Sequence, residues 1–321
     1  MAREKVVGRM VAGGSESGNV DAACESGDPA SGADRLRVDN YDAVARRITR
    51  ADRPLLHELT VSVFWPHRTR DLDEFLALGE GYLATDEIGR AMGSAMYYFA
   101  GDDFAMLGMM VTAPRLQTLG TGRWLLGHIM ADAAGRDMRL SATRSGYWLY
   151  ESEGFVPLVT IWQHQGIARP FRLPAPVPDL TLRALQPGDW SALRTLDKIA
   201  FGAERTKTLD LLAQVASGVV VERDGRICGY ALIRSFGRGK VIGPVIAEDD
   251  ATAMMLVAPL IKAHEGEFVR LDTPVESKTF EAFLSAGGLG VYDTVTEMYY
   301  GRQRRPLEGL QIYGLAAHSL G

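Results

Sequence analysis

Two stretches of this chain repeat one order of apolar and polar patterns. In residues 39–167, a short strand pattern and helical periodicity precede three apolar segments joined by short turns, over 81–111. Residues 179–304 follow the same order, with the three apolar segments over 218–246. Apolar runs joined by short turns that contain glycine predict an antiparallel meander of three strands. Each stretch then continues with patterns that predict a helix, a strand, a helix and a final strand.

This repeated order predicts an α/β fold with a mixed (α+β) sheet, present twice in tandem. Val111 and Val245 end matching strands, so the repeat is 134 residues long (245 − 111). That period is too long for a solenoid and indicates duplication of a whole domain. We therefore predict one domain over 39–167 and a second over 179–304.

Three further segments differ in composition from the two repeats. Residues 1–38 are rich in Gly, Ser, Ala and Asp, which predicts a disordered leader. Residues 168–178 are rich in proline and predict an extended linker between the repeats. Residues 305–321 follow the second repeat as a C-terminal tail.

Composition argues against several classes of function. The 321 residues are 46% apolar and 23% charged, with a net charge of −5, so no surface for nucleic acid is expected. The two cysteines, Cys24 and Cys228, form neither a disulfide framework nor a metal-ligand spacing, which favours a reducing compartment and no metal. No apolar stretch approaches the roughly 20 residues of a membrane span, and no signal-peptide core is present. We expect a cytoplasmic protein without a membrane partner.

The segment after Val111 carries the clearest chemical signal. It has the pattern Q-x-x-G-x-G, with Gln117, Gly120 and Gly122 between a predicted strand and a predicted helix. A dinucleotide fingerprint would need a third glycine where Leu125 stands. A P-loop would need a lysine followed by Ser or Thr, which this segment lacks.

Two glycines at this place suit a bound pyrophosphate. Without side chains at 120 and 122, backbone N–H groups can approach phosphate oxygens closely. The free amides and positive dipole end of the following helix favour an anion, and Arg123 adds a cation. A turn that needs glycine only for its conformation is the alternative interpretation.

At these residues the chain resembles the GNAT (Gcn5-related) N-acetyltransferase family, over about 46–166. "VTAPRLQTLGTGRWLL" (111–126) is similar to the family's acyl-CoA motif. "LSATRSGYWLYESEGF" (140–155) is similar to the family motif that ends in L-Y-x-x-x-G-F and closes the site. The resemblance implies a GNAT fold and acetyl-CoA as co-substrate.

The resemblance also implies where the co-substrate lies. The pantetheine arm would fill a gap between the strand that ends at 111 and the next strand, near 138–142. Gln117 would lie at the mouth of the glycine loop. Backbone groups of Met109, Met110 and Val111 would bond the pantetheine, and the amides that wrap the pyrophosphate would be those of Leu119, Gly120, Thr121, Gly122 and Arg123. Tyr150 matches the family tyrosine that faces the CoA sulfur, where a phenol can protonate the leaving thiolate.

No residue is an obvious general base. The strand "FAMLGMMV" has no carboxylate in its interior, and Asp102 and Asp103 before it are typical of a turn. Ser141 is a candidate for holding a relay water. The acceptor pocket is expected in "FWPHRTRDLDEF" (64–75), with candidate substrate-binding residues Trp65, His67, Arg68 and Asp71, unless this is a surface loop with one buried tryptophan. The remaining histidines form no constellation, so structural roles are expected for His57, His128, His164, His264 and His318.

The second repeat lacks the residues that would bind CoA. Aligned on the strand ends, it has Met254 in place of Gly120 and Leu256 in place of Gly122, and both side chains would block a phosphate. We expect Asp249 and Asp250 to cap their own helix. The position of Tyr150 is taken by an apolar side chain, either Phe283 or Leu284.

These observations predict an acetyl-CoA-dependent N-acetyltransferase acting on the amine of a small molecule by direct attack. Two alternatives stay open: a CoA-binding sensor or assembly module without turnover, and an acyltransferase that uses another acyl-CoA or a hydroxyl acceptor. The second repeat either closes over the acceptor pocket or serves packing and dimerisation, which leaves a homodimer open. In the first case Arg234, Arg270 and Asp272 become candidates, although ordinary strand and turn charges are the favoured interpretation.

Overall fold

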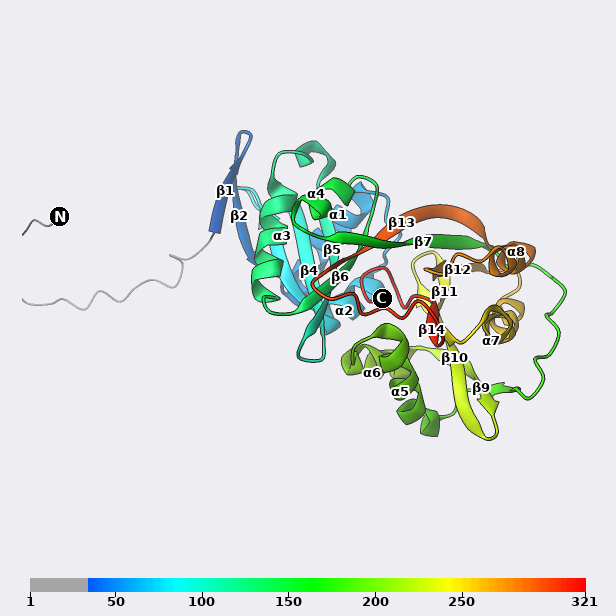
Figure 1. Cartoon of the computed structure of the whole chain (residues 1–321). Helices are drawn as coiled ribbons and strands as arrows, with labels where there is room; N and C mark the ends of the chain where they lie inside the picture. Colours follow the sequence, from blue (N-terminus) through cyan, green and yellow to red (C-terminus); the bar gives the residue numbers. More distant parts are fainter. Residues whose placement is uncertain (1–33) are drawn as a thin grey trace, which may run out of the picture. The chain divides into compact units, whose positions relative to one another are not determined.

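Residues 34–321, the part of the chain that this computed structural model describes, contain one strand–helix order twice (Figure 1). The first repeat consists of β2 (Tyr41–Arg47), α1 (Arg53–Ser62), α2 (Thr69–Leu78), β3 (Glu80–Thr85), β4 (Ala91–Ala100), β5 (Phe104–Thr112), α3 (Thr121–Asp132), β6 (Asp137–Ala142), α4 (Tyr147–Ser152) and β7 (Val156–Ile167). The second consists of β8 (Thr181–Ala184), α5 (Trp190–Phe201), α6 (Thr206–Val215), β9 (Ser217–Arg223), β10 (Arg226–Phe236), β11 (Gly239–Ala247), α7 (Asp250–Ala263), β12 (Phe268–Thr273), α8 (Lys278–Ala286) and β13 (Gly290–Tyr300).

Both repeats contain the predicted antiparallel meander. β3, β4 and β5 pair in turn, and so do β9, β10 and β11. A β-bulge interrupts the last hairpin of each meander at the same place, with Val111 opposite Ser94 and Val245 opposite Ala231. The matching bulges confirm the 134-residue spacing of the strands (245 − 111), and the mixed sheet confirms the predicted fold class.

The strands of both repeats form one sheet because the repeats exchange their last strands. β13 of the second repeat pairs with β6, and β7 of the first repeat pairs with β12. β7 and β13 also pair with each other, and they run side by side in Figure 1 (green and orange). The predicted boundaries at 39–167 and 179–304 therefore delimit repeats in the sequence, whereas Asp34–Gly321 forms one compact unit.

A buried ion cluster stabilises the pairing of β13 with β6. Glu297 on β13 and Arg139 on β6 are each only 1% exposed. Glu297 accepts hydrogen bonds of 2.6 and 2.5 Å from Arg305, and Arg139 Nε lies 3.6 Å from the same carboxylate. Because an unpaired charge at this depth is costly, the cluster favours this register over a shifted one.

The segment before the first repeat corrects one prediction. β1 (Asp34–Val38) pairs with β2, and Val38 is fully buried, although we expected a disordered leader through residue 38. Residues 1–33, with Cys24, lie outside the described residues. In 34–321, no helix is long and apolar enough to cross a membrane, and no group of three His, Cys, Asp or Glu could hold a metal ion.

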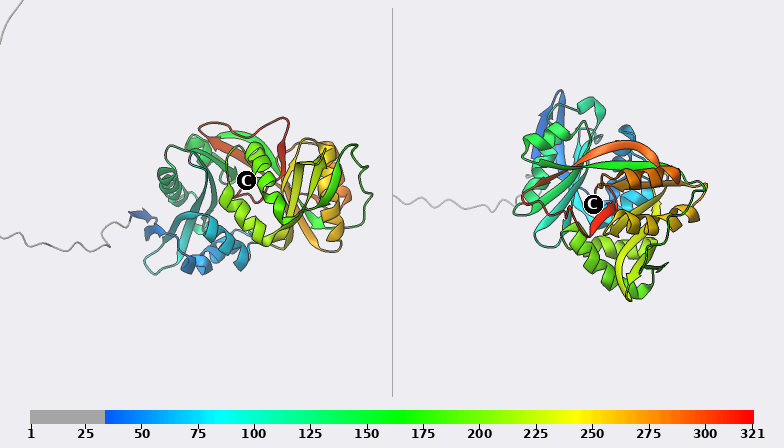
Figure 2. Two further views of the ribbon diagram at one scale, coloured as in Figure 1. Left: turned by 90° about the horizontal axis from the view of Figure 1, so that it is seen from below. Right: turned by 45° about the vertical axis from the view of Figure 1, so that its right-hand side comes forward.

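The linker and the tail differ in structure. Residues 168–180, between β7 and β8, contain neither helix nor strand. The tail forms β14 (Gln311–Gly314), which pairs antiparallel with β11. Residues Leu315, Ala316 and Ala317 after it are buried, and the chain end lies within the folded unit (Figure 2).

Candidate active site

β5 and β6 diverge at the centre of the first repeat. They pair in parallel only from Phe104–Leu107 with Asp137–Leu140, although β5 runs on to Thr112 and β6 to Ala142. Met109 lies in the bulge with φ +50°, and its carbonyl accepts a 2.8 Å hydrogen bond from Ser94 Oγ. Beyond Leu107, the edge of β5 therefore has backbone groups that β6 does not bond.

The second repeat has the same divergence, but its own chain fills it. β11 pairs with β12 only through Lys240 and Val241. Farther along, β14 pairs with β11 through Ile312 and Gly314, and the Leu315 N–H donates to the Asp272 carbonyl on β12 at 2.8 Å. The tail strand therefore occupies the place that is open between β5 and β6.

The glycine loop leads from the divergent end of β5 to α3. Gly120 is the N-cap residue with φ +95°, and a Cβ there would meet no atom within 4 Å. Within residues 34–321, no hydrogen bond takes up the amides of 120–123. The Thr121 Oγ1 is buried and also has no partner among the described residues. These unpaired donors at the start of α3 are compatible with a bound pyrophosphate.

The corresponding connection in the second repeat corrects our alignment. Residues 113–120 separate β5 from α3, whereas only 248–249 separate β11 from α7. Met254 and Leu256 therefore lie inside α7 and do not replace Gly120 and Gly122 at the turn. The turn between β11 and α7 still offers no place for a phosphate. The reason is that it lacks the loop found between β5 and α3, and not that bulky side chains replace the glycines.

The start of α7 carries its own cap. Asp249 accepts a 2.8 Å hydrogen bond from the Thr252 amide, as we predicted for a capping residue. Asp250 does not cap the helix, because it accepts hydrogen bonds from the hydroxyls of Ser277 (2.5 Å) and Tyr313 (3.1 Å). A carboxylate therefore occupies the anion-binding end of α7, while the same end of α3 is free.

Other predicted loop residues lie as follows. Leu119 is exposed, and Gln117 Nε2 donates to the Thr112 carbonyl at 3.4 Å. Gly122 lies in the first turn of α3, where a Cβ would come within 3.3 Å of Thr112 Oγ1. The Arg123 guanidinium donates hydrogen bonds to Glu153 and Ser152 at the end of α4, so it is already bound to that helix.

Tyr150 is buried on α4 and lines the cavity next to the divergence, together with Met109 and Met110. Its hydroxyl makes no hydrogen bond in the described part of the chain, which leaves it free to donate. Burial raises the pKa of Tyr150 well above its ordinary value, so the phenol is protonated at neutral pH. In α8 of the second repeat, Leu284 is fully buried and Phe283 packs against Phe280, and neither can donate a proton.

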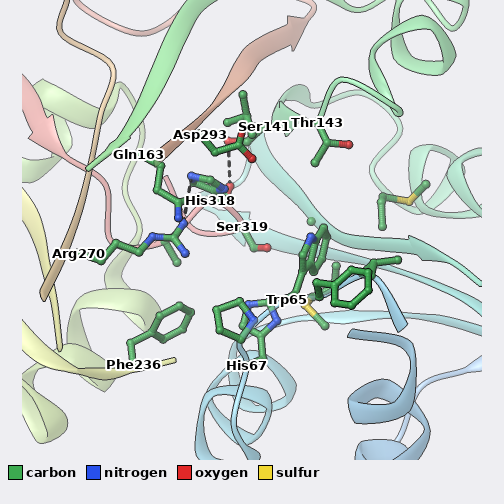
Figure 3. A pocket seen from close by; sticks show the side chains of 18 of the residues that line it. Trp65, His67, Ser141, Thr143, Gln163, Phe236, Arg270, Asp293, His318 and Ser319 are labelled. Carbon is green, nitrogen blue, oxygen red and sulfur yellow. Dashed lines mark hydrogen bonds between the residues drawn. The ribbon is translucent and has the colours of Figure 1, made fainter. Parts of the chain in front are cut away.

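A cavity of about 300 Å³ begins at the divergence and extends between the repeats (Figure 3). Its walls come from the α1–α2 loop, β5, β6, α4, β7, the β10–β11 turn, β12, β13 and the tail. The second repeat therefore lines the cavity, through Phe236, Arg238, Arg270, Tyr292, Asp293 and Val295.

The α1–α2 loop reaches this cavity as predicted, through Trp65 and His67. The His67 ring makes edge contacts with the rings of Trp65, Phe75 and Phe236. Its Nδ1 is buried without a partner in the described residues. Burial, with a further contribution from Arg270, lowers the pKa of His67 to about 3, so this imidazole is neutral.

Arg68 and Asp71, also predicted to bind substrate, do not line the cavity. Arg68 donates to the Arg238 carbonyl at 3.1 Å. Asp71 is fully buried and accepts 2.8 Å hydrogen bonds from the amides of Arg68 and Gly237. Asp71 thus caps α2 and joins it to the β10–β11 turn, which is a structural role.

We expect Asp71→Ala to lower the free energy of unfolding by about 2–4 kcal/mol, because it leaves two amides unsatisfied inside the protein. The matched control is Asp73→Ala on the same helix, whose exposed ion pair with Arg53 at 3.0 Å contributes less than about 1 kcal/mol. Urea unfolding of both variants measures the difference. Equal effects would contradict the role assigned to Asp71.

Ser141 lies on β6 in the cavity wall, and its hydroxyl donates to the His318 carbonyl at 3.2 Å. Asp102 and Asp103 lie in the β4–β5 turn, where Asp103 pairs with Arg304, so they are turn residues as expected. Neither aspartate lines the cavity.

A polar cluster lies opposite the α1–α2 loop (Figure 3). The sequence offered Arg234, Arg270 and Asp272 as candidates for the case in which the second repeat lines the pocket, but it did not offer His318. His318 and Arg270 line the cavity, and Arg270 is held by buried Asp272 through hydrogen bonds of 2.7–3.0 Å. Arg234 is buried beneath the tail and donates to the Ala316 carbonyl at 2.9 Å. The alternation of apolar residues near Ile312 could have predicted the strand in the tail. No sequence pattern indicated that His318 lines the cavity.

Comparison with known proteins agrees with the fold. Residues 193–314, from α5 to β14, match the family model described as an acetyltransferase (GNAT) domain. The uncharacterized N-acetyltransferase YitH of Bacillus subtilis (strain 168) is 25% identical over 218 residues, which cover 67% of this chain and 76% of YitH.

Solved structures share the architecture of both repeats. One is a candidate acetyltransferase from Pyrococcus horikoshii, with a TM-score of 0.71 and 19% identity over 87% of this chain and 96% of that one. Another is a tandem GNAT protein from the clavulanic acid biosynthesis pathway, with a TM-score of 0.55 and 12% identity over 81% and 99% of the two chains. At these identities the likeness shows the fold alone.

The exchanged sheet and its two strand divergences define a tandem GNAT architecture. With the family match over 193–314 and the curated relative, they show a GNAT fold whose second repeat is similar to domains of the GNAT acetyltransferase family. Members of this family use acetyl-CoA. Because the family match covers the second repeat, it does not assign the co-substrate to either repeat.

Proposed function

We propose that the protein is an N-acetyltransferase that binds acetyl-CoA in its first repeat and acetylates the amine of a small molecule. The observation that carries this proposal is the contrast between the repeats. The β5–β6 divergence is open and leads to an uncapped helix, while the β11–β12 divergence is filled by β14 and leads to a capped one.

The residues of the first repeat fit acetyl-CoA as substrate. The amides of 120–123 would hold the pyrophosphate, and the unpaired edge of β5 after Leu107 would bond the pantetheine. Attack by the amine nitrogen on the thioester carbon forms a C–N bond and breaks the C–S bond. Tyr150, which lines the cavity, would protonate the departing sulfur.

The cavity favours a small acceptor with an apolar part. Its volume of about 300 Å³ would have to hold both the acceptor and the acetyl end of acetyl-CoA. The rings of Trp65 and Phe236 line it. Arg270 and Asp293 offer charges of both signs near these rings. An amine with an apolar body and an anionic group suits this arrangement better than a long basic peptide.

The test is thiol release from acetyl-CoA across a panel of small amines, with calorimetry of acetyl-CoA binding. We expect turnover with at least one amine and one acetyl-CoA bound per chain. Binding without transfer to any amine would favour a sensor, and transfer only from another acyl-CoA or only to a hydroxyl would favour the other alternative. Two molecules bound per chain would contradict the assignment to the first repeat.

A further inference from the structure

Resting on the proposed function, we infer that the acceptor amine carries a carboxylate, and that Arg270 on β12 binds this carboxylate and thereby selects the substrate. Two guanidinium groups, those of Arg238 and Arg270, line the cavity, and Asp293 is the one carboxylate among its lining residues in 34–321. The lining therefore has one positive charge in excess (2 − 1). An acceptor whose reacting amine is neutral and whose other end is a carboxylate balances that charge.

The Arg270 guanidinium is held in one orientation by two partners. Its Nε and Nη2 donate to Asp272 at 2.7–3.0 Å, and Nη2 also donates to His318 Nε2 at 3.3 Å (Figure 3). Asp272 is 1% exposed and does not line the cavity, so it holds the guanidinium from behind. A guanidinium that is already ordered loses little side-chain freedom when a ligand binds to it.

The third nitrogen of this guanidinium, Nη1, is left for a ligand. Its N–H groups have no hydrogen-bond partner in residues 34–321, and Nη1 is not closed off from solvent. Gln165 on β7 lies directly opposite Arg270, so both side chains point to the same face of the sheet, and both line the cavity. The Gln165 Oε1 accepts from Gln163 at 2.9 Å, which leaves its NH2 group to donate to a second carboxylate oxygen.

This anion site is close to the place where the amine must react. Arg270 contacts the His318 ring, and the His318 carbonyl accepts a 3.2 Å hydrogen bond from Ser141 on β6. Ser319, the next residue of the tail, packs against Gly108 on β5. The tail therefore joins Arg270 to both strands of the divergence. One small molecule can place its carboxylate at Arg270 and its amine at the divergence.

Arg238 is the competing cation in the cavity, and its position is less suitable. It is exposed in the β10–β11 turn, and its guanidinium has no ion pair within residues 34–321. A ligand would have to order this side chain, and water screens its charge. The charge of Arg270, in contrast, acts inside the cavity. After burial, Arg270 makes the largest contribution to the lowered pKa of His67 on the α1–α2 loop.

A carboxylate suits this site better than a phosphate. Asp272 already compensates one charge beside Arg270, and Nη1 is the open part of the guanidinium. A carboxylate brings one negative charge and two acceptor oxygens. A phosphate group brings close to two charges and three oxygens, and the Asp272 carboxylate opposes the second charge.

The first arm of the test compares amines that differ in one group. The panel contains phenylalanine with phenethylamine and β-alanine with ethylamine, and each pair differs by a carboxylate. Aminoethylphosphonate has a phosphonate where β-alanine has its carboxylate. We expect the wild type to prefer the carboxylate-bearing member of at least one pair by roughly 10- to 100-fold in kcat/KM, because hydrogen bonds between charged groups are worth that much. The phosphonate should be the poorer substrate.

The second arm changes the site. Arg270→Gln alone would leave Asp272 buried and unpaired, which destabilises the fold, so the variant to use is Arg270→Gln with Asp272→Asn. This double variant should bind acetyl-CoA like the wild type and lose the preference, because KM for the carboxylate-bearing amine rises roughly tenfold or more. The control is Arg223→Gln on β9, whose exposed partner Glu248 is 3.1 Å away and which does not line the cavity. It should keep the preference.

Four results would overturn the inference. Equal kcat/KM within every pair would exclude a carboxylate site, and a preference that persists in the double variant would exclude Arg270. A preference lost in Arg238→Gln but kept in the double variant would assign the carboxylate to Arg238. A phosphonate used better than the carboxylate would make the site one for phosphate-like groups. All four leave acetyl transfer to an amine intact, whereas transfer to no amine at all would refute the proposed function and this inference together.

Discussion

Gly122→Glu should abolish detectable acetyl-CoA binding, with affinity lowered on the order of 100- to 1,000-fold. The new carboxylate would stand in the first turn of α3, beside the amides of 120–123 that have no partner in the described residues. It would bond those amides and repel phosphate, as Asp249 does for its own helix in the second repeat. Two like charges about 4 Å apart cost about 4 kcal/mol near a protein surface, which supports this magnitude.

Gly127→Glu is the matched control for this variant. Gly127 lies on the same helix, away from its N-terminus, and a Cβ there would meet no atom within 4 Å. The control adds the same charge, so it should bind acetyl-CoA like the wild type in calorimetry. Wild-type affinity in Gly122→Glu, or equal losses in both variants, would show that the glycine loop does not hold the pyrophosphate.

Tyr150→Phe should lower kcat roughly 100-fold or more and leave the affinity for acetyl-CoA within about twofold. The phenol is buried at the divergence of β5 and β6, and burial raises its pKa, so it is protonated when the thiolate leaves. Removing the hydroxyl keeps the ring and its packing against Phe155. The measurement is kcat for thiol release, together with calorimetry.

Tyr147→Phe provides the comparison on the same helix. The Tyr147 hydroxyl donates to Glu151 at 3.4 Å on the exposed side of α4, so its removal should leave kcat unchanged. If Tyr150→Phe retains the full kcat, another group protonates the sulfur. A large loss of acetyl-CoA affinity in this variant would instead make Tyr150 a binding residue.

The parts of the fold that depend on local pattern could be predicted from the sequence. The meanders follow from apolar runs and short turns, and the loop before α3 was recognised because both motifs lie within one repeat. Trp65 and His67 were proposed because the resemblance implies an acceptor pocket between the first two helices, and both side chains line the cavity. Tyr150 was proposed from its spacing to Gly154 and Phe155 in the motif that resembles the family's, and it lines the same cavity.

The parts that depend on contacts between distant segments could not be predicted. β7 and β13 have similar apolar patterns, and nothing in their periodicity says which neighbour each one pairs with. The alignment at Met254 was wrong because it assumed a loop of constant length between strand and helix. Asp71 was assigned to substrate because its partner amide, Gly237, lies 166 positions away in the sequence.

The exchange of last strands also determines the order in which this protein can be built. At the centre of the sheet, Met298 of β13 lies opposite Leu140 of β6. One edge of β6 therefore has no partner until the second repeat has been synthesised. Pairing between such distant segments slows folding, and an open strand edge can pair with another chain in the meantime. We therefore expect the first repeat made alone to aggregate or to exchange strands between molecules, and the full chain to need dilute conditions for efficient refolding.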